Sequence, residues 1–372
     1  MVTTVKRKLA SLPVAPPKTP GLPFELPERT AVTLLRGQKR NRAIPLPEGD
    51  LPGGIPGFDP GYRDIVDYIV RITDDIWLRG AIGLIYATYD HACSVYGAHD
   101  IARSVEEVVA GTTSSLHAFT KTRMQYLNVA WNEQAEGYYT SHLGVRRAIN
   151  TGTSMFGPAT HARVAIHFAA DCISSENRIH TEWLVRASGE LLRQLGLDLH
   201  SVAQVMAETP PRELVMLSPE TRLIGQMPRA RLELERSTVE GWARHLFHDV
   251  WNLRRLGWLG QYYEPDVRAY FAGRKATDLR QLADLLIAVQ AAMPDSIMHV
   301  DHVCYSEEAD GTIVAVRWRL EGTLHAGVFG KPPAGKPVCI LGVSHLRLNG
   351  PRVCQEWVVF DELAILIQAY RP

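Results

Sequence analysis

The chain has 372 residues, enough for two domains with sizeable cores. Forty Lys plus Arg balance forty Asp plus Glu, and this zero net charge argues against a general nucleic-acid binder. Five scattered cysteines without a CxxC motif argue against a disulfide scaffold or zinc ribbon and favour reduced thiols. No apolar run has the length of a signal peptide or a membrane span, so we expect a cytoplasmic protein without nucleic-acid or membrane partners.

Residues 1–60 are predicted to form a Pro-rich, basic, extended arm. They contain eleven of the 23 prolines, and nine Lys or Arg against two Glu precede residue 43. Proline removes backbone donors, so regular helices and ladders are disfavoured here. The apolar pairs Leu34-Leu35 and Ile44-Pro45-Leu46 suggest docking onto the body of the protein.

Residues 61–198 predict a first α+β unit. Isoleucines recur near helical spacing in residues 64–89, and a second helix is expected over residues 104–119. Strands are predicted over residues 124–131, 138–149, 162–173 and 179–185, with Glu176-Asn177 as a hairpin turn and residues 191–197 closing the unit. Residues 199–240 read as a linker with short helices at 202–206 and 229–235.

Residues 241–372 predict a second unit of the same kind. Helices are expected around residues 242–256 and 279–293, and strands over residues 296–305, 312–320, 338–348 and 353–360. One constant shift along the sequence aligns the two units. It places Trp77 on Trp251, Tyr89 on Tyr263, Met124 on Met298, Gly137 on Gly311 and Glu182-Trp183 on Glu356-Trp357. We therefore interpret the chain as two copies of one unit.

The end of the second unit contains the strongest candidate for a catalytic residue. Apolar and polar residues alternate on both sides of Asn349-Gly350, which predicts two antiparallel strands joined by a tight hairpin. Asp361 follows the last strand and shares a face with Val359 and Trp357, because side chains alternate along a strand. Burial on an apolar face raises a carboxyl pKa, as a base that works near neutral pH requires.

Several motifs in this region occur in a recognisable order. They are Gly322-Thr323, Gly327, Phe329-Gly330, Pro332-Pro333-Ala334-Gly335-Lys336, Glu356-Trp357, Asp361 and Gln368. With them, residues 251–368 resemble the SnoaL-like polyketide (ester) cyclase family of the nuclear-transport-factor-2-like superfamily. The resemblance implies an α+β fold of two tandem cone-shaped barrels, each a curved, mostly antiparallel sheet wrapped around N-terminal helices. It also implies that Asp361 is the acid/base of a cofactor-free intramolecular aldol ring closure, assisted by His345.

Each candidate also has a structural interpretation. Asp361 is equally suited to cap the helix that follows it, and a lone histidine such as His345 is often a satisfied core residue. Trp318, Trp357 and Tyr263 are candidates for an aromatic ligand wall, although aromatic residues at strand spacing are more often core. Val359, Tyr270 and His325 complete the predicted substrate-binding set. His325 is displaced by one residue from the family's pattern, and Tyr270 stands where the family commonly has a histidine.

In the first unit, Ala187 occupies the position that matches Asp361. An alanine cannot act as acid or base, so the sequence predicts that the second unit carries any activity and that the first is degenerate. No metal site and no cofactor are predicted.

Three functions fit this sequence. The first is a cyclase or isomerase that removes a proton next to a carbonyl of a small apolar or aromatic, carbonyl-containing, polyketide-like ligand. The second is a non-catalytic small-molecule-binding protein of the same fold, and the third is an epoxide or ester hydrolase. Barrels of this superfamily form dimers, so we expect an intramolecular pseudo-dimer of the two units and consider a homodimer possible.

Overall fold

The computed structural model describes residues 18–29, 32, 54–209 and 232–372. The first unit comprises α1 (Ile65–Leu78), η1 (Ile82–Leu84), α2 (Ile85–Thr88), β1 (Tyr89–Tyr96), β2 (Ile101–Ala102), α3 (Val105–Ala118), β3 (Phe119–Gln134), β4 (Gly137–Asn150), β5 (Arg163–Ser175), β6 (Arg178–Arg186) and α4 (Ser188–Leu195). Helix α5 (Leu199–Ala207) follows it. The α+β class and the four predicted strands of this unit are confirmed.

The second unit repeats these elements in the same order. It comprises α6 (Val239–Phe247), the π-helical turn η3 (His248–Asn252), η4 (Leu256–Trp258), α7 (Leu259–Tyr262), β7 (Tyr263–Phe271), β8 (Arg274–Ala276), α8 (Leu279–Ala292), β9 (Ile297–Glu308), β10 (Gly311–Leu324), β11 (Lys336–Leu348), β12 (Val353–Phe360) and α9 (Glu362–Tyr370). Most elements follow their counterparts at the shift that aligns the sequences, as α8 follows α3.

Sequence signals for local structure account for most of these boundaries. Ser104 and Asp278 cap α3 and α8 at equivalent positions by accepting backbone N–H groups of the first turn. Glu176 and Asn177 both have left-handed φ values, 47° and 63°, and form the predicted hairpin turn between β5 and β6. Strands β1 and β7 were not predicted, and the predicted helix over residues 229–235 lies partly outside the described residues and is non-helical from residue 232 onward.

The strands form one open sheet in the order β2-β1-β6-β5-β4-β3-β9-β10-β11-β12-β7-β8. Counted outward from the contact between β3 and β9, equivalent strands of the two halves follow in the same order. The sheet is not closed, because it ends at β2 and β8, and the expected two cone-shaped barrels are not demonstrated. These edge strands have two and three residues and pair with β1 and β7.

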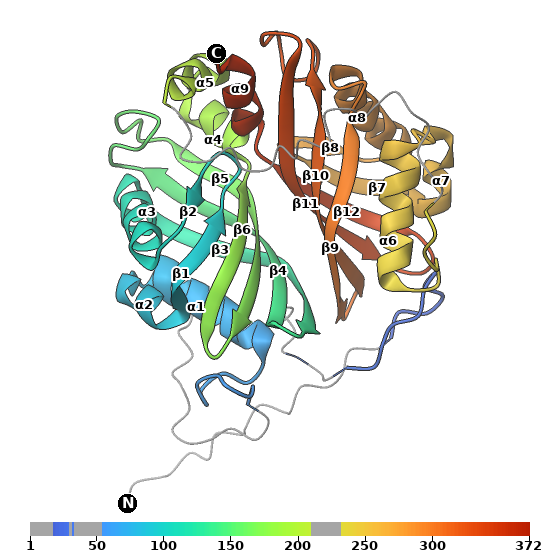
Figure 1. Ribbon diagram of the computed structural model, residues 1–372, viewed down its shortest axis with the longest axis horizontal. Coiled ribbons are helices and arrows are strands. Elements are labelled where there is room, and N and C mark those ends of the chain that lie inside the picture. The colour runs from blue at the N-terminus through green and yellow to red at the C-terminus, as the bar shows by residue number, and fades with distance from the viewer. Residues whose placement is uncertain (1–17, 30–31, 33–53, 210–231) are drawn as a thin grey trace, which may run out of the picture.

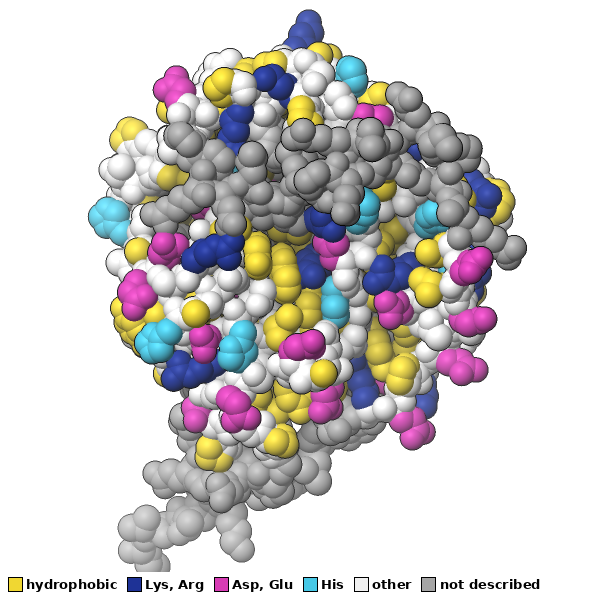
Figure 2. Space-filling model, viewed as in Figure 1, with side chains coloured by type: hydrophobic (Ala, Val, Ile, Leu, Met, Phe, Trp, Pro, Cys, Tyr) yellow, Lys and Arg dark blue, Asp and Glu magenta, His cyan; other side chains and the backbone are white. Residues whose placement is uncertain are grey.

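The two half-sheets pack against each other, and their helices lie outside. Figure 1 shows α1–α3 on one side of the molecule and α6–α8 on the other, with the strands between them. A single residue pair, Trp131 with Tyr305, joins β3 to β9. The facing surfaces share a buried cluster that includes Leu143 and Val185 of the first unit and Val343 and Val359 of the second. Figure 2 shows hydrophobic side chains gathered between the two units on one face.

Part of the N-terminal arm lies against the second unit. The Glu25 backbone N–H donates to the Ser237 carbonyl oxygen at 2.7 Å, and Phe24 packs on Trp242 with ring centroids 5.2 Å apart. The pairs at residues 34–35 and 44–46, which suggested docking, fall outside the described residues. In the part of the chain that is described, no helix is long and apolar enough to cross a membrane.

Candidate functional site

Inward-facing aromatic side chains fill the interior of the second unit. Trp318 on β10 lies over Gly342 on β11, where an added Cβ would approach the indole ring to 2.2 Å. Its indole N–H donates to Ser344 Oγ at 3.1 Å. Phe360 lies between Trp318 and Phe271, with ring centroids 6.4 and 5.5 Å away. All three rings are buried, so this interior is occupied by the protein itself.

The first unit has polar or smaller side chains at the matching positions. The shift that aligns the units pairs His142 with Val316, Gly144 with Trp318, Arg146 with Leu320 and Arg186 with Phe360. Two adjoining cavities of about 210 and 280 Å³ lie in this unit, and both are lined by Arg146 and Arg186. We call the smaller one the α1 cavity, because α1 lines it, and the larger one the Asp361 cavity. Both cavities thus lie in or against the unit that the sequence analysis expected to be degenerate.

The wall of the α1 cavity carries buried polar groups that favour their neutral forms. The Tyr89 hydroxyl donates to Glu182 Oε2 at 2.8 Å, and burial raises the pKa of both groups. Burial lowers the pKa of His142 to about 4, so its imidazole is neutral near pH 7. His142 Nδ1 has no hydrogen-bond partner among the described residues. A ligand group can therefore form a hydrogen bond with this ring.

The Asp361 cavity is built from both units. From the first unit, α3, β4 and the start of α4 contribute Ser115, Arg146 and Ser188, and His99 lies in the wall as well. From the second unit, Asp361 enters the wall directly after β12. Alternation along β12 turns Asp361 away from the filled interior of its own unit and towards the first.

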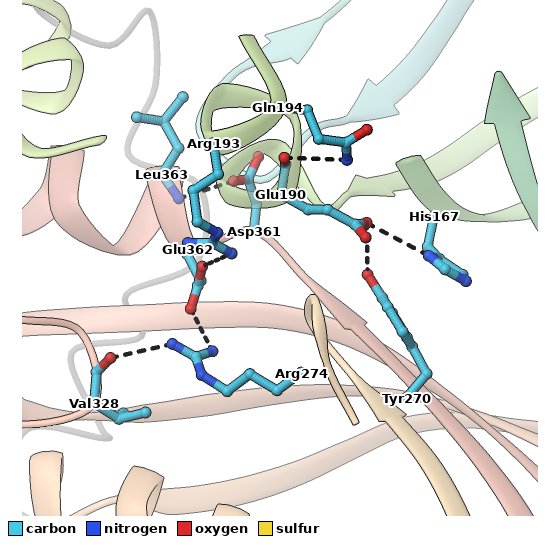
Figure 3. Close-up of polar contacts among 10 residues, drawn as sticks. All are labelled: His167, Glu190, Arg193, Gln194, Tyr270, Arg274, Val328, Asp361, Glu362 and Leu363. Atoms are coloured by element: carbon cyan, nitrogen blue, oxygen red, sulfur yellow. Dashed lines mark hydrogen bonds and ion pairs between the residues drawn. The ribbon is translucent and has the colours of Figure 1, made fainter. Parts of the chain in front are cut away.

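Asp361 is buried and held by two hydrogen bonds. It is the N-cap of α9 and accepts from the Leu363 backbone N–H at 2.9 Å, as Figure 3 shows. The Ser188 hydroxyl of the first unit donates to its other oxygen at 2.6 Å. Burial raises the pKa of Asp361, and the neighbouring His99 and the hydrogen bond from Ser188 act in the opposite direction. His99 Nδ1 has no hydrogen-bond partner in the described ranges.

Comparison with known families identifies the second unit. Residues 242–369 match the family model described as SnoaL-like polyketide cyclase. We call this stretch the SnoaL-like domain, because it is similar to that family. Among curated proteins, no sequence matches this chain.

Solved structures similar to part of this chain come from several bacteria. A SnoaL-like polyketide cyclase from Agrobacterium tumefaciens strain C58 has 20% identity and a TM-score of 0.30, covering 34% of this chain and 94% of that chain. A protein of ketosteroid isomerase-like fold from Catenulispora acidiphila has 10% identity and a TM-score of 0.29, covering 35% and 93%. TsrD from Streptomyces laurentii has 11% identity and a TM-score of 0.31, covering 36% and 97%.

His345 of the SnoaL-like domain does not accompany Asp361. It is buried at the contact between the two half-sheets, where its Nε2 lies 2.9 Å from Ser141 Oγ and its Nδ1 contacts Asn128 of the first unit. Burial lowers its pKa to about 3, with a smaller effect of the nearby His142. His345 pairs with Trp357, four residues before Asp361, so the strand register does not bring the imidazole beside the acid. The predicted assistance of Asp361 by His345 has no support in this geometry.

Most of the side chains that were predicted to bind substrate also lie outside the two cavities. Trp357 and Val359 of the SnoaL-like domain pack in the cluster between the half-sheets, and Trp318 fills its interior. Tyr270 stacks on His167 of the first unit with centroids 3.6 Å apart and donates to Glu190 at 2.9 Å (Figure 3).

Two further predicted residues, Tyr263 and His325, line neither cavity. Tyr263 is buried in the SnoaL-like domain beside Glu356. His325 is exposed to solvent. Of the eight predicted site residues, Asp361 lines a cavity described above.

The residues that the sequence prediction missed are His99, His142, Arg146, Arg186 and Ser188. The alignment of the two units could have pointed to three of them. His142, Arg146 and Arg186 are polar, whereas the residues aligned with them in the SnoaL-like domain are the apolar Val316, Leu320 and Phe360. Across residues 18–29, 32, 54–209 and 232–372, no group of three or more His, Cys, Asp or Glu side chains is arranged to hold a metal ion.

Proposed function

We propose that this protein is a cyclase or isomerase acting on a carbon next to a carbonyl, with the reaction taking place in the Asp361 cavity. The family match of residues 242–369 supports the class of chemistry. The observation that carries the proposal is the buried carboxyl of Asp361, which the second unit contributes to a hollow in the first. We also propose that the units are tandem copies, which their common strand order supports.

Proton transfer is the role we assign to Asp361. As a carboxylate, it takes the proton from the carbon next to the substrate carbonyl, and the electron pair moves onto the carbonyl oxygen as an enolate. In a cyclisation, the enolate carbon attacks a second carbonyl carbon of the same molecule, and the resulting alkoxide takes up a proton. The raised pKa of Asp361 makes its carboxylate a stronger base and narrows the gap to the pKa of the substrate C–H group. His99 in the same wall is the second proton-transfer group of this proposal.

One observation favours the non-catalytic binding protein instead. Asp361 caps α9, and a cap alone is sufficient reason for an aspartate at this position. The two roles make different demands on the side chain. An asparagine caps a helix about as well as an aspartate but cannot accept a proton from carbon.

The test is proton exchange on a simple carbon acid. The full chain is incubated with 2-tetralone, a flat bicyclic ketone, in deuterated water, and deuterium uptake next to the carbonyl is followed by mass spectrometry. We expect the wild type to accelerate uptake and Asp361→Asn to lose about 100-fold or more of that acceleration while remaining folded.

The matched control is Asp278→Asn, which alters the N-cap of α8 away from both cavities. It should retain the acceleration. Equal uptake by wild type and Asp361→Asn, or no acceleration by the wild type, would favour the binding protein.

A further inference from the structure

Two arginines stand in the wall that the α1 cavity and the Asp361 cavity share. Arg146 on β4 is buried, with 7% of its surface exposed, whereas Arg186 at the end of β6 is exposed. Both line both cavities. Their charges are close enough that Arg186 contributes, after burial, to lowering the pKa of Arg146 to about 10. The hollow therefore carries two neighbouring positive charges.

Neutral groups hold Arg146 in place. Its Nη1 donates to Ser115 Oγ at 2.8 Å, and its Nη2 lies 3.4 Å from Thr122 Oγ1. The guanidinium carbon lies 4.7 Å from the centre of the Trp77 ring. Its Nε has no hydrogen-bond partner among the described residues. These contacts orient the guanidinium but supply no negative charge, and a buried charge without a counter-charge is costly.

In the described part of the chain, no acid in these walls forms an ion pair with Arg146 or Arg186. Glu182 accepts a hydrogen bond from Tyr89, and Asp361 accepts one from Ser188. Arg186 is near enough to Glu182 to act against the rise that burial causes in the pKa of this acid. Asp100 also lines both cavities. Glu107, on the α3 side of the α1 cavity, accepts from the Arg103 backbone N–H at 3.1 Å. Arg186 makes no hydrogen bond or ion pair with any residue in the described part of the chain.

The second unit shows that the fold does not need these arginines. Leu320 and Phe360 occupy the equivalent positions, and both are buried in the apolar core of that unit. The same arrangement of strands is thus stable with apolar side chains there. Two arginines in the first unit therefore require a reason other than folding.

We propose that the ligand of this hollow carries an anionic oxygen group, a carboxylate or a phosphate, which binds between Arg146 and Arg186. The inference rests on the proposed function, since it names the substrate class of the same site. A guanidinium suits such a group because it presents paired N–H donors to two oxygens. The remaining wall, with Ile72, Trp77 and Phe168, accepts an apolar ring system.

Three probes with the same rings test this inference. Calorimetric titration of the full chain compares 2-naphthoate, 2-naphthyl phosphate and the uncharged 2-naphthamide. We expect at least one anion to bind about tenfold or more tightly than the amide, since a hydrogen bond to a charged group contributes about 1.5–3 kcal/mol. The tighter anion identifies the class. An amide that binds as tightly as both anions, or no binding of either anion, would overturn the proposal.

Variants show whether the arginines are responsible. Arg186→Met and Arg146→Leu, the latter copying Leu320 of the second unit, should each remove the preference for the anion over the amide. Arg147→Met is the matched control, because Arg147 follows on the same strand, is exposed and lines neither cavity. Loss of the preference in Arg147→Met, or its retention in Arg186→Met, counts against the proposal.

A second readout requires no ligand. Arg186→Met should raise the denaturant midpoint of the free protein, because it removes repulsion from Arg146, and Arg147→Met should not. A lower midpoint for Arg186→Met than for Arg147→Met would show that Arg186 serves the fold. Because 2-tetralone carries no anionic group, its exchange tests Asp361 separately. Normal exchange together with absent anion preference would refute this inference alone.

Discussion

Ser188 of the first unit donates a hydrogen bond of 2.6 Å to Asp361 of the second, across the contact between the two halves of the chain. The acid that resembles the catalytic residue of the cyclase family is thereby bound to the unit that contains the cavities. Its own unit has Phe360, the preceding residue, packed into a closed aromatic interior. One unit thus supplies the acid, and the other supplies most of the cavity wall.

Ser188→Ala should shift the pH dependence of exchange. The hydrogen bond from Ser188 stabilises the charged form of Asp361 and lowers its pKa, so removing it raises that pKa further. A base must be deprotonated to act, and we therefore expect the acidic limb of the pH–rate profile for 2-tetralone to move to higher pH. Ser114→Ala alters another hydroxyl of the same cavity wall and should leave the limb in place. An unmoved limb in Ser188→Ala would contradict the role of this contact.

Trp318→Ala should destabilise the protein without abolishing exchange. The ring is buried over Gly342, and removing a buried tryptophan costs about 3–5 kcal/mol in the free energy of unfolding. Gly342→Ala should also be destabilising, because its Cβ meets the indole, whereas Gly257→Ala has free space. Urea denaturation measures the first effect and 2-tetralone exchange the second. Loss of exchange in a folded Trp318→Ala protein would place the reaction in the second unit after all.

Glu356→Gln should change how stability depends on pH. Burial raises the pKa of Glu356 from 4.5 to about 7, so within this window the folded chain holds a proton that the unfolded chain releases. Its contribution to the free energy of unfolding is therefore present below pH 4.5 and is lost as the pH rises through the window, by about 3 kcal/mol. The variant should lack this loss.

Urea denaturation of both proteins across this window measures the difference. The buried, neutral His142 and His345 have the opposite effect, since their pKa values are lowered and the unfolded chain takes up protons below its histidine pKa. Comparing Glu356→Gln with wild type at each pH cancels their contribution. Parallel stability curves for the two proteins would show that Glu356 is not responsible.

Arg29→Met should weaken the junction of the two half-sheets. The guanidinium donates to the carbonyl oxygens of Trp131 and Tyr305 at 2.5 and 2.6 Å, the pair that joins β3 to β9. It also lies 4.4 and 3.7 Å from the centres of these two rings. Charged hydrogen bonds of this kind contribute about 2 kcal/mol, so we expect a loss of that size in the free energy of unfolding. Lys18→Met, in the same arm, should have no effect, and equal losses in both variants would contradict the prediction.

Local structure followed from local signals in most of the chain. The caps at Ser104 and Asp278 and the hairpin at Glu176-Asn177 were readable, because they depend on side chains next to the backbone groups they satisfy. Strands β1 and β7 were not, because they pair in parallel with β6 and β12, which follow much later in the chain. Such pairing leaves no turn signal in the sequence.

The candidate site was harder to predict than the fold. Alternation predicted that Asp361 shares a face with Val359 and Trp357, but it could not tell whether that face borders a cavity or another sheet. The arginines of the first unit were overlooked because Ala187, opposite Asp361 in the alignment, suggested a unit without chemistry.

The sequence by itself determined the α+β class, the constant shift between the units and the resemblance of the second unit to the cyclase family. These properties depend on the order and spacing of residues along one segment. Only the tertiary structure decided which unit is hollow and which residues surround Asp361, because a cavity depends on the volumes of side chains from strands distant in sequence. Leu320 and Phe360 are buried in one interior, and Arg146 and Arg186 at the matching positions line the cavities of the other.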